Sequence, residues 1–189
     1  LGATDDAVLV VTLGRLTPQK AHHHVITLAK LLRERHPQLR YAILGEGARA
    51  AELQAFATSE GVADLVCLAG LRTDTANVLG SADIYLSCSD WEGMPLSTIE
   101  AMASRLPTVA TQTEGSGQLL TEGCGLVVPI GNVEAMANAL STLVNNPDLR
   151  QQIGEAANKR ARARFGHERM MSELAAVLAN LTTVATTEH

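Results

Sequence analysis

The stretch that decides the fold is ADIYLS (82–87), followed by CSDWEGMPLSTIEAMASRL (88–106) and PTVAT (107–111). Two short apolar runs flank a segment with helical spacing, in which Pro95 suits the first position of a helix because its missing N–H costs nothing there. Leu96, Ile99 and Ala103 are expected on the core face of that helix. A strand, a helix and a second strand in this order predict a βαβ unit with parallel strands.

Four further apolar runs extend this pattern to both sides: AVLVVTL (7–13), LRYAIL (39–44), LVCLAG (65–70) and GLVVP (125–129). The runs are almost continuously apolar, as in parallel strands that helices cover on both faces. Helical patterns lie between them at 24–35 and 132–143. The sequence therefore predicts a single α/β domain over 1–189, with a parallel sheet of about six strands in a core at about 7–146. Two helices at about 148–164 and 167–181 are expected to close it.

Composition excludes several classes of protein. The net charge of −5 and the pI near 5.7 argue against nucleic-acid binding, and 3% aromatic residues are too few for a stacking platform. No apolar run approaches the roughly 18 residues of a membrane span. Cys67, Cys88 and Cys124 lack metal-ligand spacing and are expected to be buried, reduced thiols of a cytoplasmic protein. A late cluster of basic residues fits either a solvated helix face or contact with anionic lipid or an acidic partner: Arg150, Lys159, Arg160, Arg162, Arg164 and Arg169.

The loops after the strands are where a ligand is expected, because open parallel sheets bind ligands beyond the carboxyl ends of their strands. After the first strand, Gly14 allows a sharp turn, and Arg15 and Lys20 are two cations that could converge on one anion. The alternative is two unrelated surface cations.

The second strand leads into GEGARA (45–50), which formally fits the G-x-G-x-x-A dinucleotide fingerprint. The fingerprint belongs after the first strand of such a unit, with an acidic residue at the end of the next strand. The next strand here ends at Gly70 without an acid. We therefore expect a glycine turn beside a ligand and not a site for NAD.

The helix predicted from Pro95 has N–H groups at Leu96 and Ser97 that no earlier turn can pair, which favours an anion. Glu92 lies just before this helix and Glu100 just over one turn inside it. A diphosphate at the helix start would leave one carboxylate on each side for sugar hydroxyls. Taken alone, Glu100 could equally be a solvent-facing helix acid.

The segments GRLTPQK (14–20), GEG (45–47) and EGMPLSTIEAMA (92–103), with two glutamates eight positions apart, resemble the C-terminal half of GT-B retaining glycosyltransferases of the family 4 type. The resemblance runs in order along nearly the whole chain. It implies a Rossmann-like three-layer domain that binds a nucleoside diphosphate sugar for transfer to an acceptor. No metal-ligand cluster is visible in the sequence, so we expect no metal or other cofactor. We expect none at His22, His23 and His24 either, because neighbours on a helix point in different directions.

The resemblance also implies roles for single residues. Arg15 and Lys20 would bind the donor diphosphate, Glu92 would contact the donor sugar at the catalytic centre, and Glu100 would hold the ribose hydroxyls. Further substrate contacts, largely through backbone, are implied for Gly45, Leu71, Gly93, Met94, Leu96 and Ser97.

The sequence departs from the family pattern at four positions. Ala21 and Arg105 stand where glycine is usual, and Glu114 and Gln118 replace a usual glycine and glutamate. These changes leave the detailed geometry of the donor-side loops open.

The start at Leu1 instead of Met is expected if the chain is a piece of a longer protein. The resemblance implies that an N-terminal acceptor domain precedes it and that the isolated piece is inactive. The whole enzyme is expected in the cytoplasm, with peripheral contact at the inner face of a membrane. Two alternatives stay open: an enzyme like the nucleotide-sugar 2-epimerases, and a non-catalytic nucleotide-sugar-binding module. The base, the sugar and the acceptor leave no trace in the sequence.

Overall fold

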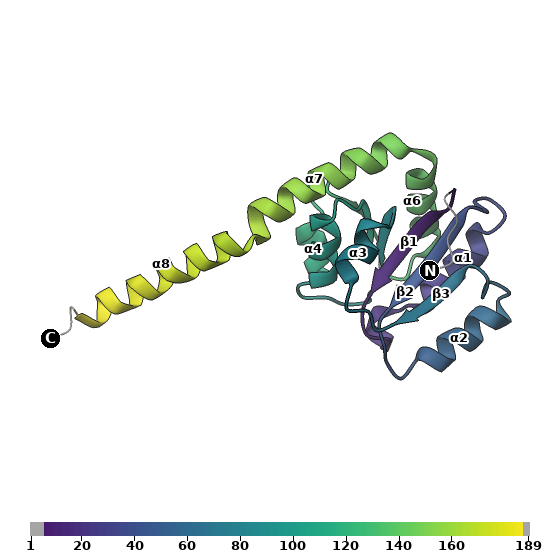
Figure 1. Cartoon of the computed structure of the whole chain (residues 1–189), viewed down its shortest axis with the longest axis horizontal. Helices are drawn as coiled ribbons and strands as arrows, with labels where there is room; N and C mark the ends of the chain where they lie inside the picture. The colour runs from purple at the N-terminus through teal and green to yellow at the C-terminus, as the bar shows by residue number, and fades with distance from the viewer. Residues whose placement is uncertain (1–5, 187–189) are drawn as a thin grey trace.

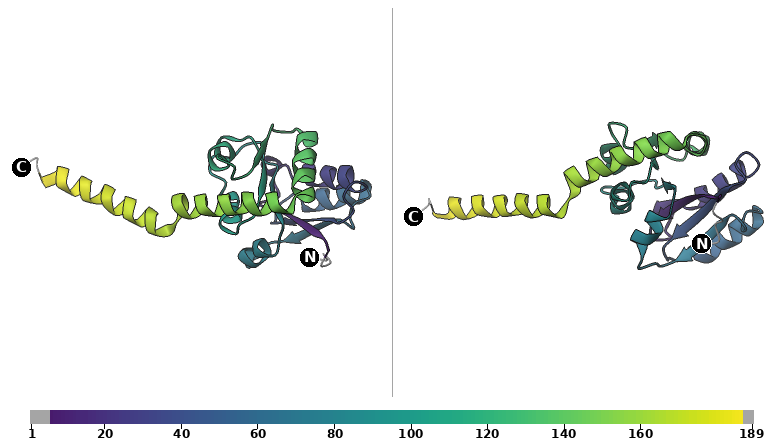
Figure 2. Two further views of the ribbon diagram at one scale, coloured as in Figure 1. Left: turned by 90° about the horizontal axis from the view of Figure 1, so that it is seen from above. Right: turned by 45° about the horizontal axis from the view of Figure 1, so that its top comes forward.

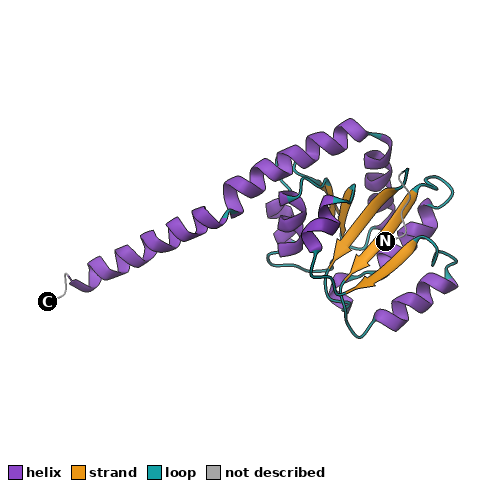
Figure 3. Ribbon diagram, viewed as in Figure 1, coloured by secondary structure: helices purple, strands orange, loops and turns teal. Residues whose placement is uncertain are grey.

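The structure is a computed structural model that describes the backbone of residues 6–186 and the side chains of residues 6–179. Six strands alternate with helices along the chain (Figures 1 and 3). The strands are β1 (Val8–Leu13), β2 (Leu39–Leu44), β3 (Val66–Gly70), β4 (Ile84–Ser87), β5 (Thr108–Thr111) and β6 (Leu126–Val128). The helices are η1 (Pro18–Lys20), α1 (His23–Leu32), α2 (Ala50–Ser59), α3 (Thr75–Gly80), α4 (Leu96–Ala103), α5 (Glu114–Leu119), α6 (Val133–Asn145), α7 (Pro147–Phe165) and α8 (His167–Thr186).

All six strands form one parallel sheet in the order β3-β2-β1-β4-β5-β6. The β1–β2 ladder runs from Val8 opposite Leu39 to Leu13 opposite Leu44, whereas β1 meets β4 at Val10–Ile84 and Val11–Tyr85. The chain order reverses between β1 and β4, which makes the carboxyl ends of these two strands the switch point of the sheet. The predicted sheet is confirmed, with every strand within two residues of its expected bounds.

Helices cover both faces of the sheet, so the domain has three layers (Figure 2). On one face α1, α2 and α6 bury Val25, Ile26, Leu28, Leu53, Met136 and Leu140 against Val10, Tyr41, Ile43, Ile84 and Val109. On the other face α3 and α4 bury Val78, Leu79 and Ala101 against Leu9, Val11 and Tyr85. The central strands β1, β2 and β4 therefore send apolar side chains to both layers, which is why their sequences read as continuous apolar runs.

The last two helices differ from each other. Helix α7 packs on α4 through Met102, Ala157 and Ala161 and closes the domain as expected. Helix α8 instead projects from the body as a long arm (Figures 1 and 2). Its apolar side chains are exposed: Met170, Met171, Leu174, Val177 and Leu178. The expectation that 167–181 would close the domain is therefore wrong, because α8 leaves these apolar side chains exposed instead of packing them on the sheet domain.

Other local expectations need smaller corrections. Helix α1 ends at Leu32 and not at 35, and a turn fills the interval before Pro37. Residues 114–119 form the short helix α5, capped by Thr113, whose hydroxyl accepts from the Ser116 N–H. All three cysteines are unpaired, but only Cys88 and Cys124 are buried. Burial raises the pKa of the Cys88 thiol to about 12. Within the described residues, no helix is long and apolar enough to span a membrane.

Candidate functional site

Three loops meet at the switch point, after β1, β2 and β4. The Gly14 N–H donates to Leu44 O over 2.9 Å, and the Leu16 N–H donates to Glu46 O over 2.9 Å. Gly45 has φ +145°, and a Cβ added there would lie 1.9 Å from Gly14 O. Glycine at position 45 therefore lets the two turns touch.

Two adjoining cavities open where the loops meet. The first, of about 380 Å³, is lined by Leu13, Gly14, Arg15, Gln19, Lys20, Glu92, Ser97 and Glu100. The second, of about 710 Å³, is lined by Leu13, Gly14, Arg15, Leu44, Gly45, Glu46, Gly47, Leu71, Arg72 and Thr75. Because Leu13, Gly14 and Arg15 line both, the two cavities form one elongated site.

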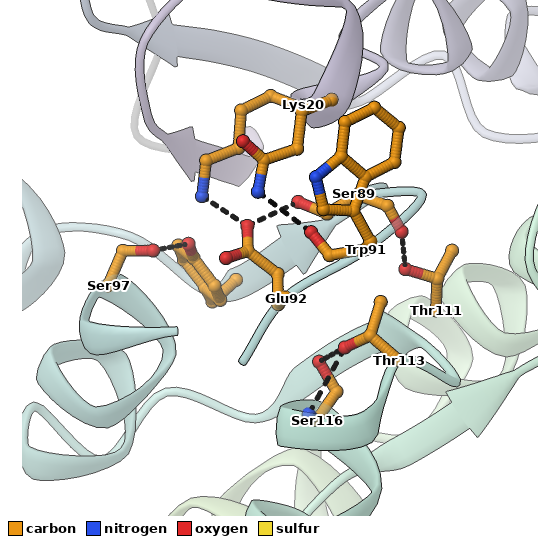
Figure 4. A network of polar contacts seen from close by, with 10 residues as sticks. Lys20, Ser89, Trp91, Glu92, Ser97, Thr111, Thr113 and Ser116 are labelled. Carbon is orange, nitrogen blue, oxygen red and sulfur yellow. Dashed lines mark hydrogen bonds and ion pairs between the residues drawn. The ribbon is translucent and has the colours of Figure 1, made fainter. Parts of the chain in front are cut away.

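An ion pair lies in the first cavity (Figure 4). The Lys20 ammonium donates to Glu92 Oε1, and the Ser89 hydroxyl donates to the same oxygen over 2.9 Å. The Lys20 side chain is 19% exposed and that of Glu92 is 9% exposed. The pair is therefore largely enclosed by the loops that supply it.

Hydrogen bonds to backbone carbonyls hold these loops in register. The side-chain amide of Gln19 donates to Trp91 O over 2.8 Å, and the Asp90 N–H donates to Gln19 O over 2.9 Å. The Thr111 hydroxyl donates to Ser89 O from β5 (Figure 4). Glu92 thus sits in a loop that neighbouring elements fix from two sides.

Helix α4 begins at Leu96, with Pro95 in the extended conformation just before it. The N–H groups of Thr98 and Ile99 donate to Pro95 O, so those of Leu96 and Ser97 lie ahead of the first helical turn. The Ser97 hydroxyl accepts from Tyr85 OH over 2.8 Å. Burial raises the pKa of Tyr85 to about 12, so its phenol stays a donor that orients Ser97.

The structure brings seven predicted site residues to the two cavities: Arg15, Lys20, Gly45, Leu71, Glu92, Ser97 and Glu100. Gly93, Met94 and Leu96 do not line either cavity and lie exposed beside them. The contacts of all ten residues with a ligand stay predictions. Of the expected core face of α4, only Ile99 packs, partly buried, against a core cluster. Leu96 is 68% exposed and Ala103 is exposed, while Thr98, Ala101 and Met102 are buried. Leu96 is the first helical residue and precedes the turn that packs on the sheet.

Sequence analysis did not single out four residues of the site. Gln19 and Thr75 line the cavities, while Tyr85 and Ser89 orient Ser97 and Glu92. Gln19 lies between Arg15 and Lys20 in the sequence, so its position could have predicted that it lines the site. Tyr85 reads as one more apolar residue of a buried strand, and nothing in the sequence marks its hydroxyl as part of the site.

The three histidines follow the site directly along the chain. His22 is 2% exposed, and neither of its ring nitrogens has a partner among the described residues. Burial, followed by the charges of Lys20 and Arg49, lowers the pKa of His22 to about 4. Within the described residues no group of three or more His, Cys, Asp or Glu side chains is arranged to hold a metal ion.

Comparison with known proteins identifies the family. Residues 1–160 match the family described as Glycosyl transferases group 1. The chain belongs to this family. As a group 1 glycosyltransferase chain it shows the expected Rossmann-like parallel sheet, in the arrangement of the C-terminal half of GT-B enzymes.

Two relatives and one solved structure illustrate the likeness. The chain is 29% identical to the lipopolysaccharide core biosynthesis glycosyltransferase LpsE of Rhizobium meliloti, over 93% of its own length and 51% of that protein. It is 28% identical to the UDP-Gal:alpha-D-GlcNAc-diphosphoundecaprenol alpha-1,3-galactosyltransferase of Escherichia coli, over 84% of its length and 42% of that protein. It superposes on Anabaena HepE, solved in complex with UDP, with a TM-score of 0.87 at 23% identity, over 93% of its length and 49% of that chain. The chain spans about half the length of the curated relatives that it matches.

Proposed function

We propose that this chain is the donor-binding part of a retaining glycosyltransferase, which transfers a sugar from a nucleoside diphosphate sugar to an acceptor. One observation carries the proposal: Arg15, Lys20, Glu92 and Glu100 line the same cavity at the start of α4. Two cations and a helix N-terminus attract a diphosphate. Two carboxylates accept hydrogen bonds from hydroxyl groups, which both the ribose and the transferred sugar supply.

The chemistry of the leaving group explains the cations. As the bond from the sugar to the diphosphate breaks, negative charge develops on the diphosphate. Groups already oriented toward that charge stabilise it without reorganising. Arg15, Lys20 and the positive end of the α4 dipole are proposed to do this without a metal ion.

We assign the base of the donor nucleotide to the second cavity. It adjoins the first through Leu13, Gly14 and Arg15, and Leu71 presents an exposed apolar surface at its edge. Glu100 lines the first cavity and is assigned to the ribose. A relative named for UDP-galactose and a similar structure solved with UDP favour a uridine nucleotide for the first trials.

The rest of the protein is inferred from its relatives. Since the chain spans about half of their length, we propose that a second domain binds the acceptor. We place the whole enzyme in the cytoplasm, with peripheral contact at the inner face of a membrane. The exposed basic side chains of α7, Lys159, Arg162 and Arg164, support such contact with anionic lipid.

Calorimetric titration of the chain with UDP, GDP and ADP tests the proposal. One of the three nucleotides is expected to bind. Glu100→Ala should weaken the affinity for that nucleotide about tenfold, because lost hydrogen bonds to a carboxylate are worth roughly 1.5 kcal/mol. Glu155→Ala, at an exposed position inside α7, is the matched control and should leave binding unchanged. Absence of binding by all three nucleotides, or equal binding by Glu100→Ala, contradicts the assignment.

A further inference from the structure

The two cations of the site are in different states. The Arg15 guanidinium is exposed and has no ion-pair or hydrogen-bond partner in the part of the chain that the structure describes. The Lys20 ammonium is bound to Glu92 Oε1 (Figure 4). A ligand anion therefore finds Arg15 available, whereas it must compete with a carboxylate for Lys20.

The Lys20 position is restricted by its surroundings. Its aliphatic stem lies over Gly14, where an added Cβ would come within 2.9 Å of Lys20 Cε. Its backbone N–H donates to Thr17 O, and Lys20 ends the short helix η1. The ammonium is thus directed into the cavity, where it meets Glu92.

Only one of the two Glu92 carboxylate oxygens has a partner among the described residues. Oε1 accepts from both Lys20 and Ser89, while Oε2 has no partner among the described residues. The side chain is 9% exposed, so little water can replace a partner that leaves. An enclosed carboxylate that loses its cation and gains no donor is costly.

We propose that Glu92 is a specificity-determining residue that makes the site favour an intact sugar nucleotide over the bare nucleoside diphosphate. The inference rests on the proposed function. A bare diphosphate must take Lys20 away from Glu92 and then leaves two negative groups facing each other in the first cavity. An intact donor supplies sugar hydroxyls to Glu92, which replace the hydrogen bonds that Lys20 gave.

The same competition acts after transfer. Once the sugar has left, no hydroxyl donors remain beside Glu92, and the carboxylate again competes with the diphosphate for Lys20. The internal ion pair therefore weakens binding of the product. Glu92 would thus limit product inhibition as well as contact the donor sugar.

Glu92→Gln tests the inference, since it keeps the side-chain shape and removes the charge. The probes are the pairs UDP with UDP-glucose and GDP with GDP-mannose, titrated by calorimetry into the chain. For the pair that the wild type binds, the variant should bind the bare diphosphate about threefold to tenfold tighter, the range expected from breaking a partly enclosed ion pair. It should bind the sugar nucleotide more weakly, so that the preference ratio falls.

The control is Glu60→Gln, which removes the same charge from the Lys30–Glu60 pair at 2.6 Å, outside both cavities. It should change neither affinity. Lys20→Met is the second variant, in case Glu92→Gln does not fold. It should weaken both ligands, because each draws Lys20 to its diphosphate, and it should keep the preference for the sugar nucleotide, because Glu92 keeps its charge.

The outcomes separate the two proposals. If the wild type binds no nucleotide of either pair, the proposed function is wrong and the inference is wrong with it. If the wild type binds a pair but Glu92→Gln leaves the preference ratio unchanged, only the inference is wrong. Loss of the preference for the sugar nucleotide in Lys20→Met, where Glu92 is kept, also overturns the inference.

Discussion

At the scale of single residues, His22 stands out because it is buried beside the proposed diphosphate site and neither ring nitrogen has a hydrogen-bond partner among residues 6–179. Its pKa is lowered to about 4, first by burial and then by the charge of Lys20. The folded chain therefore keeps His22 neutral over a pH range in which the unfolded chain binds a proton.

This difference predicts a loss of stability in acid. Below the ordinary pKa of 6.5 the unfolded state takes up a proton at His22, while the folded state does so only near pH 4. The free energy of unfolding therefore falls as the pH falls through this window, by about 2 kcal/mol from His22 between about pH 7 and about pH 5. Urea unfolding at the two pH values measures this change.

His22→Leu should remove the His22 contribution, and the difference in slope between wild type and variant isolates it. The pKa values of His23, His24 and His36 are also lowered by burial, so the variant should keep a smaller loss of the same sign. Equal slopes for wild type and variant would show that His22 is not the group responsible.

Among the described residues, three that are not glycine have a left-handed backbone conformation: Ala21 at φ 46°, Glu122 at φ 58° and Arg105 at φ 61°. Glycine adopts this region without a steric cost. Ala21 and Arg105 are two of the positions where glycine was expected from the resemblance. Their turns therefore carry the steric cost of a side chain.

The site could be predicted only partly at this scale. Arg15, Lys20, Glu92 and Glu100 are charged residues at strand ends or at a helix start, and such residues carry a visible signal. Gly93, Met94 and Leu96 were expected from the resemblance to contact a ligand through their backbone; they do not line either cavity, and these contacts stay predictions. The Lys20–Glu92 pair joins residues 72 positions apart and depends on the sheet order.

At the scale of elements, the packing of α7 on α4 depends on one small residue. Gly154 of α7 faces the end of α4, where a Cβ added to it would lie 2.1 Å from Arg105 O. Asn158, one turn later, donates from its side-chain amide to Ala103 O over 2.6 Å. The two helices therefore meet by direct contact with backbone.

Gly154→Ala should destabilise the chain, although alanine usually favours a helix by about 1 kcal/mol over glycine. The methyl group has no room beside a carbonyl, and overpacking typically costs about 1–3 kcal/mol. We expect the thermal midpoint to fall by roughly 2–8 °C, measured by circular dichroism, since about 1 kcal/mol shifts the midpoint of a chain of this size by about 2–4 °C. Gly80→Ala is the control, because a Cβ there meets nothing within 4 Å at the end of α3. A raised midpoint in Gly154→Ala would contradict the packing.

The elements themselves were predictable to different degrees. Strands buried on both faces have near-continuous apolar sequences, so all six were found. The short helices α3 and α5 have only six residues each, and α5 includes two glycines, so neither has a strong periodic pattern. The apolar spacing of α8 predicts a helix that needs a partner, but periodicity does not say which surface provides it.

At the scale of the whole molecule, the site is open. The chain spans about half of its curated relatives, and transfer requires two substrates to be held together away from water. We predict that the chain alone binds donor nucleotide but transfers no sugar. Incubation with a radiolabelled sugar nucleotide and candidate acceptors measures this. Turnover by the chain alone would show that no second domain is needed.

The arm formed by α8 has a further consequence for how the chain unfolds. Its turns gain almost nothing from the core, so they should open far more often than those of the sheet domain. Amide hydrogens of α8 would then exchange with solvent within a short time, while those of β1 and β2 stay protected. Helix content and core burial would be lost in separate steps on heating, so a single two-state transition would not describe the chain.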